Sequence, residues 1–170
     1  MSSKFSPISI IKDFYKYYRH EKIMLIYVPL ILSVISSFFI RINMNLINLL
    51  LVALSIFIGF LLNLMLMSFN LKDDSIRPIE VAGKVWHLYD VLEEYHVTIS
   101  FEILITIILV VLMLFTSLIY KDISIFIPNF VWALRIIFNF ILSYLLILFL
   151  IILFSILQFG HVLLKYYLQN

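Results

Sequence analysis

The sequence predicts an all-α integral membrane protein, built as a single transmembrane domain over residues 1–170. The prediction is a four-helix transmembrane bundle with an N-terminal interfacial helix and a cytoplasmic amphipathic helix between spans 2 and 3. Hydrophobic residues make up 64% of the chain and charged residues only 13%, against about 25% charged in ordinary globular domains. The mean hydropathy is +1.13. Four apolar runs have the length that a bilayer requires.

Segment 1–22 is predicted to form a cytoplasmic or interfacial helix. Ile10, Phe14 and Tyr17 or Tyr18 recur at helical spacing, which is typical of a helix lying on a membrane surface. Its basic residues are expected to contact anionic lipid head groups: Lys12, Lys16, Arg19 and Lys22. The pattern fits an anchor for the first span, and it also fits a lipid sensor or a dock for a partner.

The four predicted spans are 23–40, 46–69, 103–120 and 136–160. At about 1.5 Å per residue, the shortest run still reaches across about 27 Å of hydrocarbon. Between spans 3 and 4, segment 121–135 is predicted to be an outer interfacial loop. Trp132 fits an aromatic belt there, and Pro128 is expected to begin a short interfacial helix. Residues 161–170 are predicted to form a cytoplasmic tail.

Lys and Arg residues predict the orientation, because cytoplasmic segments carry an excess of them. The N-terminal segment, the loop between spans 2 and 3, and the C-terminus together have nine: Lys4, Lys12, Lys16, Arg19, Lys22, Lys72, Arg77, Lys84 and Lys165. The opposite side has three: Arg41, Lys121 and Arg135. We therefore expect an inner-membrane location with both termini in the cytoplasm.

Segment 70–102 is predicted to be a cytoplasmic loop with an amphipathic helix that starts near Pro78. The segment has seven acidic residues against three basic ones, with Glu102 at its end. Such a helix suits contact with a soluble cytoplasmic protein, because its acidic flanks disfavour an anionic membrane surface. The predicted partner-binding residues are the apolar stripe Val81, Val85, Leu88, Leu92 and Tyr95, with Asp90, Glu93 and Glu94 beside it.

The sequence predicts no enzyme activity, cofactor or metal. The chain has no Cys, which excludes thiolate catalysis and Cys-based metal sites. His87, Asp90 and Glu94 share a helix face, as do Glu93 and His96, but solvated charged faces explain such groups more often than metal sites do. No hydrolase, zinc-protease or phosphate-loop motif occurs. A net charge of +2 gives no indication of nucleic-acid binding.

Neutral polar and small residues within the spans predict helix packing or self-association. The central parts of the four runs have no Asp, Glu, Lys or Arg, which argues against an ion-coupled transporter. Small and amide side chains let helices approach and bond. The residues that we expect to pack within the subunit, or between copies of a homo-oligomer, are Asn48, Ser55, Gly59, Asn63, Asn139 and Ser143.

This plan of four short spans, with both termini inside and one cytoplasmic helix, resembles the small membrane subunits of bacterial anti-phage defence systems of the Kiwa type. The resemblance covers the whole chain as architecture and implies an oligomeric membrane sensor or scaffold that recruits a cytoplasmic effector. No family residues are carried over. The first functional hypothesis is therefore a non-enzymatic scaffold that binds lipid, its own copies and a cytoplasmic protein. The alternative is a pore or channel that depolarises the membrane.

Overall fold

The computed structural model describes residues 7–19, 21–39, 43–70, 78–81, 84–122 and 128–169. Side chains are described for residues 7–19, 21, 23–37, 39, 43–68, 89–117 and 136–164. Within these ranges the chain forms five helices and one pair of strands. The prediction of a helical fold is confirmed, and the strands are an addition to it.

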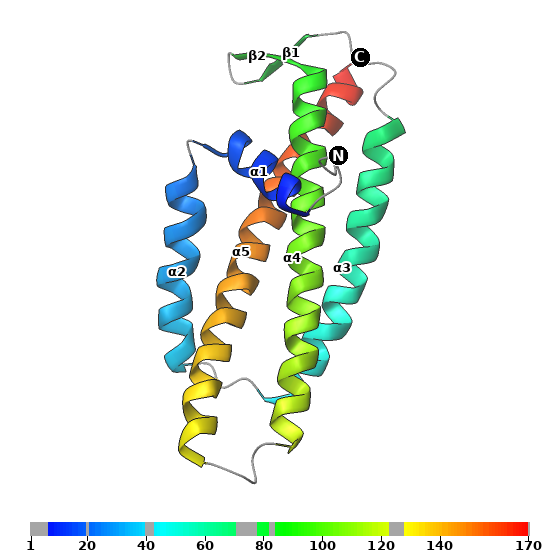
Figure 1. Cartoon of the computed structure of the whole chain (residues 1–170). Coiled ribbons are helices and arrows are strands. Elements are labelled where there is room, and N and C mark those ends of the chain that lie inside the picture. The colour runs from blue at the N-terminus through cyan, green and yellow to red at the C-terminus, as the bar shows by residue number, and fades with distance from the viewer. Residues whose placement is uncertain are drawn as a thin grey trace, which may run out of the picture.

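The long helices form a bundle with α4 and α5 at its centre. The helices are α1 Pro7–Tyr17, α2 Lys22–Phe39, α3 Met44–Asn70, α4 Leu88–Asp122 and α5 Pro128–Gln169. Helix α2 packs on α5, and α3 packs on α4. The strand pair and the C-terminal end of α5 lie at one end of the bundle, and α1 crosses the bundle near that end (Figure 1).

Three of the helices have stretches that are long and apolar enough to cross a membrane, namely Met44–Ser68, Tyr89–Ser117 and Ile136–Leu164. The apolar part of α2, Ile23–Ser37, is shorter. Large apolar side chains cover the outside of these helices; Ile56 is 69% exposed and Phe154 is 67% exposed. A surface of this kind matches lipid rather than water, so the structure indicates a membrane protein.

The interior of the bundle is built from one face of each long helix. On α3, Ile47, Leu54, Leu61 and Ser68 are all at most 3% exposed and are spaced seven residues apart. This spacing keeps the four side chains on one side of a helix. On α4 the matching interior residues include Ile99, Leu109 and Met113, each 0% exposed.

The helix predicted to start at Pro78 is wrong for residues 78–87. Strand β1, Pro78–Val81, pairs antiparallel with β2, Lys84–His87, in a register that sets Ile79 opposite Trp86. Ile79, Val81 and Val85 are β-branched and favour strands, while Gly83 would cost a helix interior about 1 kcal/mol. Local propensity therefore outweighs the helical spacing of the apolar residues.

Helices α4 and α5 are longer than the predicted spans. Helix α4 runs from Leu88 to Asp122, so the predicted boundary between a loop helix and a span beginning at residue 103 does not exist. Helix α5 begins at Pro128, a residue well suited to the first helical turn, and continues to Gln169. It therefore includes part of the predicted outer loop, the fourth span and most of the predicted tail.

Helix α1 is amphipathic, and its apolar side packs on protein rather than on lipid. Phe14 is 1% exposed, and its ring stacks on Phe101 of α4 with centroids 3.9 Å apart and an interplanar angle of 15°. Lys12, Lys16 and Arg19 are exposed. The predicted stripe is therefore present, but helix α4 covers it.

Replacing Phe14 by Ala is expected to release α1 from the bundle. Phe-to-Ala changes at buried sites cost about 3–5 kcal/mol of stability. Among the described side chains of α1, Phe14 is the single buried one. Hydrogen exchange of the purified protein should show faster exchange across Pro7–Tyr17 in Phe14→Ala. Ile11→Ala, which alters a side chain that is 37% exposed, is the matched control. Equal exchange in the two variants would contradict this role for Phe14.

Candidate functional site at the junction of α1, α4 and α5

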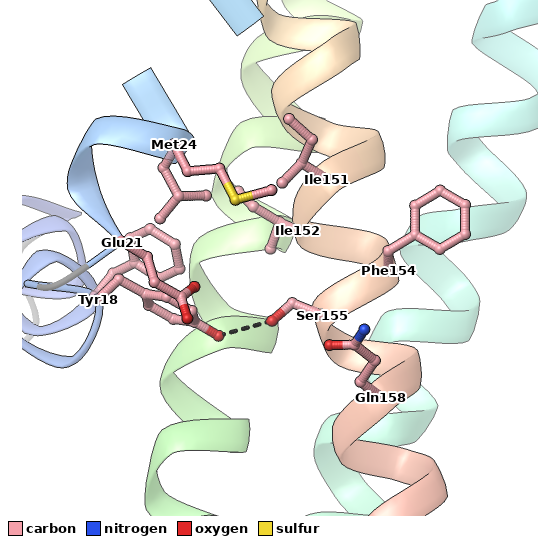
Figure 2. A pocket seen from close by; sticks show the side chains of 10 residues that line it. Tyr18, Glu21, Met24, Ile151, Ile152, Phe154, Ser155 and Gln158 are labelled. Atoms are coloured by element: carbon pink, nitrogen blue, oxygen red, sulfur yellow. Dashed lines mark hydrogen bonds between the residues drawn. The ribbon is translucent and has the colours of Figure 1, made fainter. Parts of the chain in front are cut away.

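The turn after α1 places one tyrosine hydroxyl between two helices of the bundle. The backbone N–H of Tyr18 donates to the carbonyl of Phe14, and its carbonyl accepts from the N–H of Glu21, both at 3.1 Å. The Tyr18 side chain is 6% exposed. Its hydroxyl lies 3.2 Å from Thr98 Oγ1 and 3.0 Å from Ser155 Oγ; Figure 2 shows the bond to Ser155.

These hydroxyls form a chain with a defined direction. Thr98 Oγ1 donates its proton to the backbone carbonyl of Glu94 at 2.7 Å. A hydroxyl has one proton to donate, so Thr98 accepts from Tyr18, and Tyr18 accepts from Ser155. Burial raises the pKa of Tyr18, although the hydrogen bonds to Ser155 and Thr98 act to lower it. Tyr18 is therefore a neutral phenol that connects three segments distant in sequence.

A cavity of about 250 Å³ lies beside this hydroxyl chain. Tyr18, Glu21, Ser155 and Gln158 supply its polar groups, and Figure 2 shows their oxygen-bearing ends directed to the same region. The rest of the lining is apolar: Phe14, Met24, Leu25, Ile151, Ile152 and Phe154. A few convergent polar groups beside an apolar wall are the usual arrangement for orienting a small ligand or a lipid head group.

Glu102 is fully buried one helical turn from Thr98 on α4. It is 0% exposed, and neither of its carboxyl oxygens has a hydrogen-bond partner among the described residues. The Thr106 hydroxyl donates to the backbone carbonyl of Glu102 at 2.7 Å and leaves the carboxyl group unpaired. Buried polar groups without partners are uncommon and costly, and an ionisable residue in a membrane span marks a functional position.

The position of Glu102 corrects two expectations from the sequence. The sequence predicts Glu102 at the end of a cytoplasmic loop, but it lies inside the apolar stretch Tyr89–Ser117 of α4. The sequence also predicts that the central parts of the spans have no Asp, Glu, Lys or Arg, which argues against an ion-coupled transporter. The physical reason for both errors is that α4 starts well before the apolar run, so its acidic first part belongs to the bundle.

A second cavity of about 460 Å³ lies between α3 and α5, with Tyr95 of α4 on its wall. Its lining is almost entirely apolar, with Ser68 and His161 as the polar exceptions. Ser68 Oγ lies 3.4 Å from His96 Nδ1, which is long for a strong hydrogen bond. This cavity suits hydrocarbon, and of the two cavities described the first has the more polar lining.

Acidic residues near the start of α4 surround the end of α1. Asp90 and Glu93 are exposed, and Glu94 is half-buried. The pKa of Tyr17 is raised to about 12, first by burial and then by a hydrogen bond to Glu93 and the negative charges of Glu93, Glu94 and Asp90. The basic N-terminal helix and the acidic start of α4 are therefore in contact.

The predicted partner-binding stripe divides between two environments. Leu92 and Tyr95 are 2% and 5% exposed inside the bundle, so they contribute to packing within the chain. The side chains of Val81, Val85 and Leu88 lie outside the described residues. Of the predicted polar flank, Asp90 and Glu93 are exposed. Among the described residues of this prediction, the part that remains exposed to a partner is therefore the charged flank.

The predicted packing face of α3 points outward. Asn48, Ser55, Gly59 and Asn63 are all exposed, and a Cβ added at Gly59 would meet nothing within 4 Å. On α5, by contrast, Ser143 is 7% exposed and Asn139 is half-buried. The α3 residues are therefore not buried inside the subunit, whereas Ser143 of α5 is.

The predicted lipid-interface residues are partly described. Lys12, Lys16 and Arg19 are exposed, while the side chains of Lys22 and Trp132 lie outside the described residues. Among the described residues no group of three or more His, Cys, Asp or Glu side chains is placed to hold a metal ion. The His87 side chain, one of the ligands considered from the sequence, is outside that search.

Sequence reasoning missed the two central residues of the site, Tyr18 and Glu102. One signal was present: Thr98, Glu102 and Thr106 are spaced four apart, which puts three polar side chains on one face of a helix. Comparisons of this chain with protein families, curated proteins and solved structures find no match.

Tyr17 is expected to titrate well above the ordinary tyrosine pKa of about 10. In the pH titration of tyrosine absorbance, Tyr17→Phe should remove a component with a pKa of about 12. Because the pKa is raised in the folded state, the associated stability is complete below about pH 10 and is lost as the pH rises towards 12. Tyr27→Phe, at a side chain that is 57% exposed, is the control. Loss of the same component in both variants would contradict the assignment.

Proposed function

We propose that this chain is a non-enzymatic, oligomeric inner-membrane subunit that serves as a sensor or scaffold and recruits a soluble cytoplasmic protein. In this proposal α2, α3, α4 and α5 all cross the membrane. The bundle end with α1 and the strand pair then faces the cytoplasm together with both termini. The distribution of Lys and Arg supports this orientation, and anti-phage defence is the setting that the architectural resemblance favours.

One observation carries the proposal: exposed side chains of both charges lie at one end of an otherwise apolar bundle (Figure 1). We call this surface the charged platform, defined by Lys12, Lys16 and Arg19 on and after α1 and by Asp90 and Glu93 on α4, all exposed. The buried Phe14 and Tyr18 hold α1 in place beneath it.

The mixture of signs favours a protein over lipid as the occupant of the platform. Anionic lipid attracts Lys and Arg but repels Asp and Glu. A protein surface can present complementary charges to both, which gives specificity and faster association. Tyr89, which is 50% exposed at the start of α4, adds the kind of aromatic residue that is enriched at protein interfaces.

The outward face of α3 supports assembly with further copies. Exposed Asn48 and Asn63 would each leave an amide group in or near hydrocarbon, where unpaired polar groups are costly. Ser55 satisfies its own hydroxyl by donating to the Leu51 carbonyl at 2.8 Å, and Gly59 leaves room for a close approach. A second copy of α3 would supply partners for the amides, as small and amide residues do between membrane helices.

A change on the platform is expected to release the cytoplasmic partner. The double variant Tyr89→Ser, Asp90→Arg alters two exposed side chains and removes one aromatic contact while reversing one charge. Purification in mild detergent, with mass measurement of co-purifying proteins, should show loss of a protein that accompanies the wild type. Tyrosine is enriched among the few interface residues whose truncation costs about 2 kcal/mol or more.

The control for this experiment is Leu114→Ala, at a side chain that is 50% exposed near the opposite end of α4. It should keep the partner, and both variants should reach the membrane at wild-type levels. Recovery of the same proteins in the same yield from wild type and platform variant would contradict recruitment through this surface.

A second function, a pore that permeabilises the membrane, is favoured by the same α3 face. If copies meet through Asn48, Ser55, Gly59 and Asn63, these polar groups would line the contact and provide a narrow path. We expect Asn63→Leu to lower the mass of the assembly measured in native conditions, because an interhelical amide bond contributes about 1 kcal/mol in membranes. Val111→Leu, at a lipid-facing position that is 44% exposed, should keep the assembly intact.

Purified protein in liposomes separates the two functions. A pore predicts ion flux that Asn63→Leu changes and Val111→Leu does not. A scaffold predicts tight liposomes with an assembly that still depends on Asn63. An assembly of unchanged mass in Asn63→Leu would contradict the role of the α3 face in both functions.

A further inference from the structure

The environment of Glu102 dictates its charge state. The side chain is 0% exposed, and neither oxygen has a hydrogen-bond partner among the described residues. An ionised carboxylate in such a place would lose its hydration without gaining a cation or a donor, which costs far more than burying the neutral acid. The closed bundle therefore holds the Glu102 carboxyl with a proton bound.

The elements packed against α4 differ in the ionisable groups that they carry. Helix α3 has no ionisable residue anywhere in Met44–Asn70. The ionisable residues on the other elements packed against α4, and on α4 itself near Glu102, are phenols, imidazoles, carboxylic acids and cations. They are Lys12, Asp13, Tyr15, Lys16, Tyr17 and Tyr18 at α1, Arg135, Tyr144, His161, Lys165, Tyr166 and Tyr167 on α5, Glu80, Lys84 and His87 in the strands, and Asp90, Glu93, Glu94, Tyr95 and His96 on α4.

Helix α1 covers the positions next to Glu102 on the surface of α4. The Tyr18 hydroxyl bonds to Thr98, and the Phe14 ring stacks on Phe101. Residues 98 and 101 precede Glu102 by four and by one, and a glutamate side chain on a helix points back towards the turn before it. Phe14 and Tyr18 also line the cavity of about 250 Å³, so lifting α1 removes the wall between that cavity and this face of α4.

We propose that Glu102 is a proton-binding site whose occupancy is linked to the seating of α1 on the bundle. With α1 seated, the carboxyl is enclosed and takes one proton from water. With α1 lifted, water reaches the carboxylate through the enlarged cavity, and the proton returns to solvent. The proton thus reaches Glu102 from the bundle end with α1. Apolar Leu109 and Met113, both 0% exposed, separate Glu102 from the other end.

The sign of the linkage follows from which state binds the proton more tightly. The seated state favours the neutral acid, so acidic conditions stabilise seating. As the pH rises, the lifted state gains the free energy of ionising Glu102 and the seated state does not. Seating of α1 should therefore weaken with rising pH. This inference is independent of the proposed function, since it concerns α1 and Glu102 whether or not the platform binds a protein.

The charge state is tested by infrared spectroscopy of the full chain in lipid nanodiscs, with glutamate labelled by ¹³C in its carboxyl group. At about pH 7 a glutamate with the ordinary pKa of about 4.3 is almost fully ionised, so a protonated-carboxyl band reports an enclosed glutamate. We expect this band in the wild type, its loss in Glu102→Gln and its retention in Glu93→Gln. Absence of the band in the wild type, or its persistence in Glu102→Gln, would overturn the proposal.

The linkage is tested by the distance between spin labels on α1 and α4. The chain has no Cys, so Ile11→Cys and Ile107→Cys, at exposed positions, place the two labels without background. In otherwise wild-type protein the short distance should dominate at mildly acidic pH and give way to a longer, broader distribution at mildly alkaline pH. Glu102→Gln, which cannot ionise, should keep the short distance throughout. A wild-type distribution that does not change with pH would overturn the linkage.

A third variant distinguishes a proton site from a structural residue. An unpaired buried carboxyl contributes nothing that an apolar side chain would not supply better. Glu102→Leu should therefore fold, raise the thermal unfolding midpoint and abolish the pH response of the spin-label distance. A lower midpoint in Glu102→Leu would show that the carboxyl has a stabilising partner, which contradicts the site as proposed.

Discussion

The seating of α1 across the bundle is the interaction on which the remaining features depend. Helices α4 and α5 form the central pair, yet it is Tyr18, just beyond α1, that joins them by hydrogen bonds to Thr98 and Ser155. The Phe14 ring stacked on Phe101 fixes the same segment from one turn earlier. The cavity wall, the cover over Glu102 and the position of the charged platform all follow from these contacts.

Polar contacts have this importance for a bundle whose outer surface matches lipid. Between apolar helices in a bilayer the hydrophobic effect gives little net attraction, so close packing and interhelical hydrogen bonds decide the arrangement. Many hydroxyls in the bundle bond only to their own helix: Ser33 donates to the Leu30 carbonyl, and Thr116 donates to that of Leu112. The Tyr18 hydroxyl differs because both of its partners lie on other helices. The stack of Phe14 on Phe101 packs beside these hydrogen bonds.

The sequence predicted the parts of the fold that follow from local composition. The apolar runs 23–40 and 46–69 correspond closely to α2 and α3, since a run of that length and hydropathy has few alternatives to a helix. Propensity decided against the predicted helix at residues 78–87, where β-branched residues and a glycine coincide. The sequence predicts α4 and α5 too short because charged residues bound the apolar runs, although a helix continues through such residues where its polar groups face water or a neighbouring helix.

Which face of each helix is covered was not predictable from the sequence. Helix α3 has two sets of regularly spaced residues on neighbouring faces. One set is Ile47, Leu54 and Leu61, and the other is Asn48, Ser55 and Gly59. Both are regular, and tertiary packing selected the apolar one. On α4, the burial of Glu102 depends on contacts with segments distant in the chain. A count of charges along the sequence assigns Glu102 to a hydrated loop. The local sequence does not indicate which distant segment packs against this residue.

Helix α1 connects the buried carboxyl to the surface. The cations of the platform lie at α1 and its acids on α4, so any displacement of α1 changes the spacing of opposite charges that a partner would recognise. A tenfold difference in the proton affinity of Glu102 between the seated and lifted states is worth about 1.4 kcal/mol. It corresponds to a tenfold change in the ratio of seated to lifted protein. A ligand shifts such an equilibrium only by its differential affinity for the two states. A partner that binds the seated platform would therefore have to raise the proton occupancy of Glu102, and protons would have to strengthen its binding by the same factor.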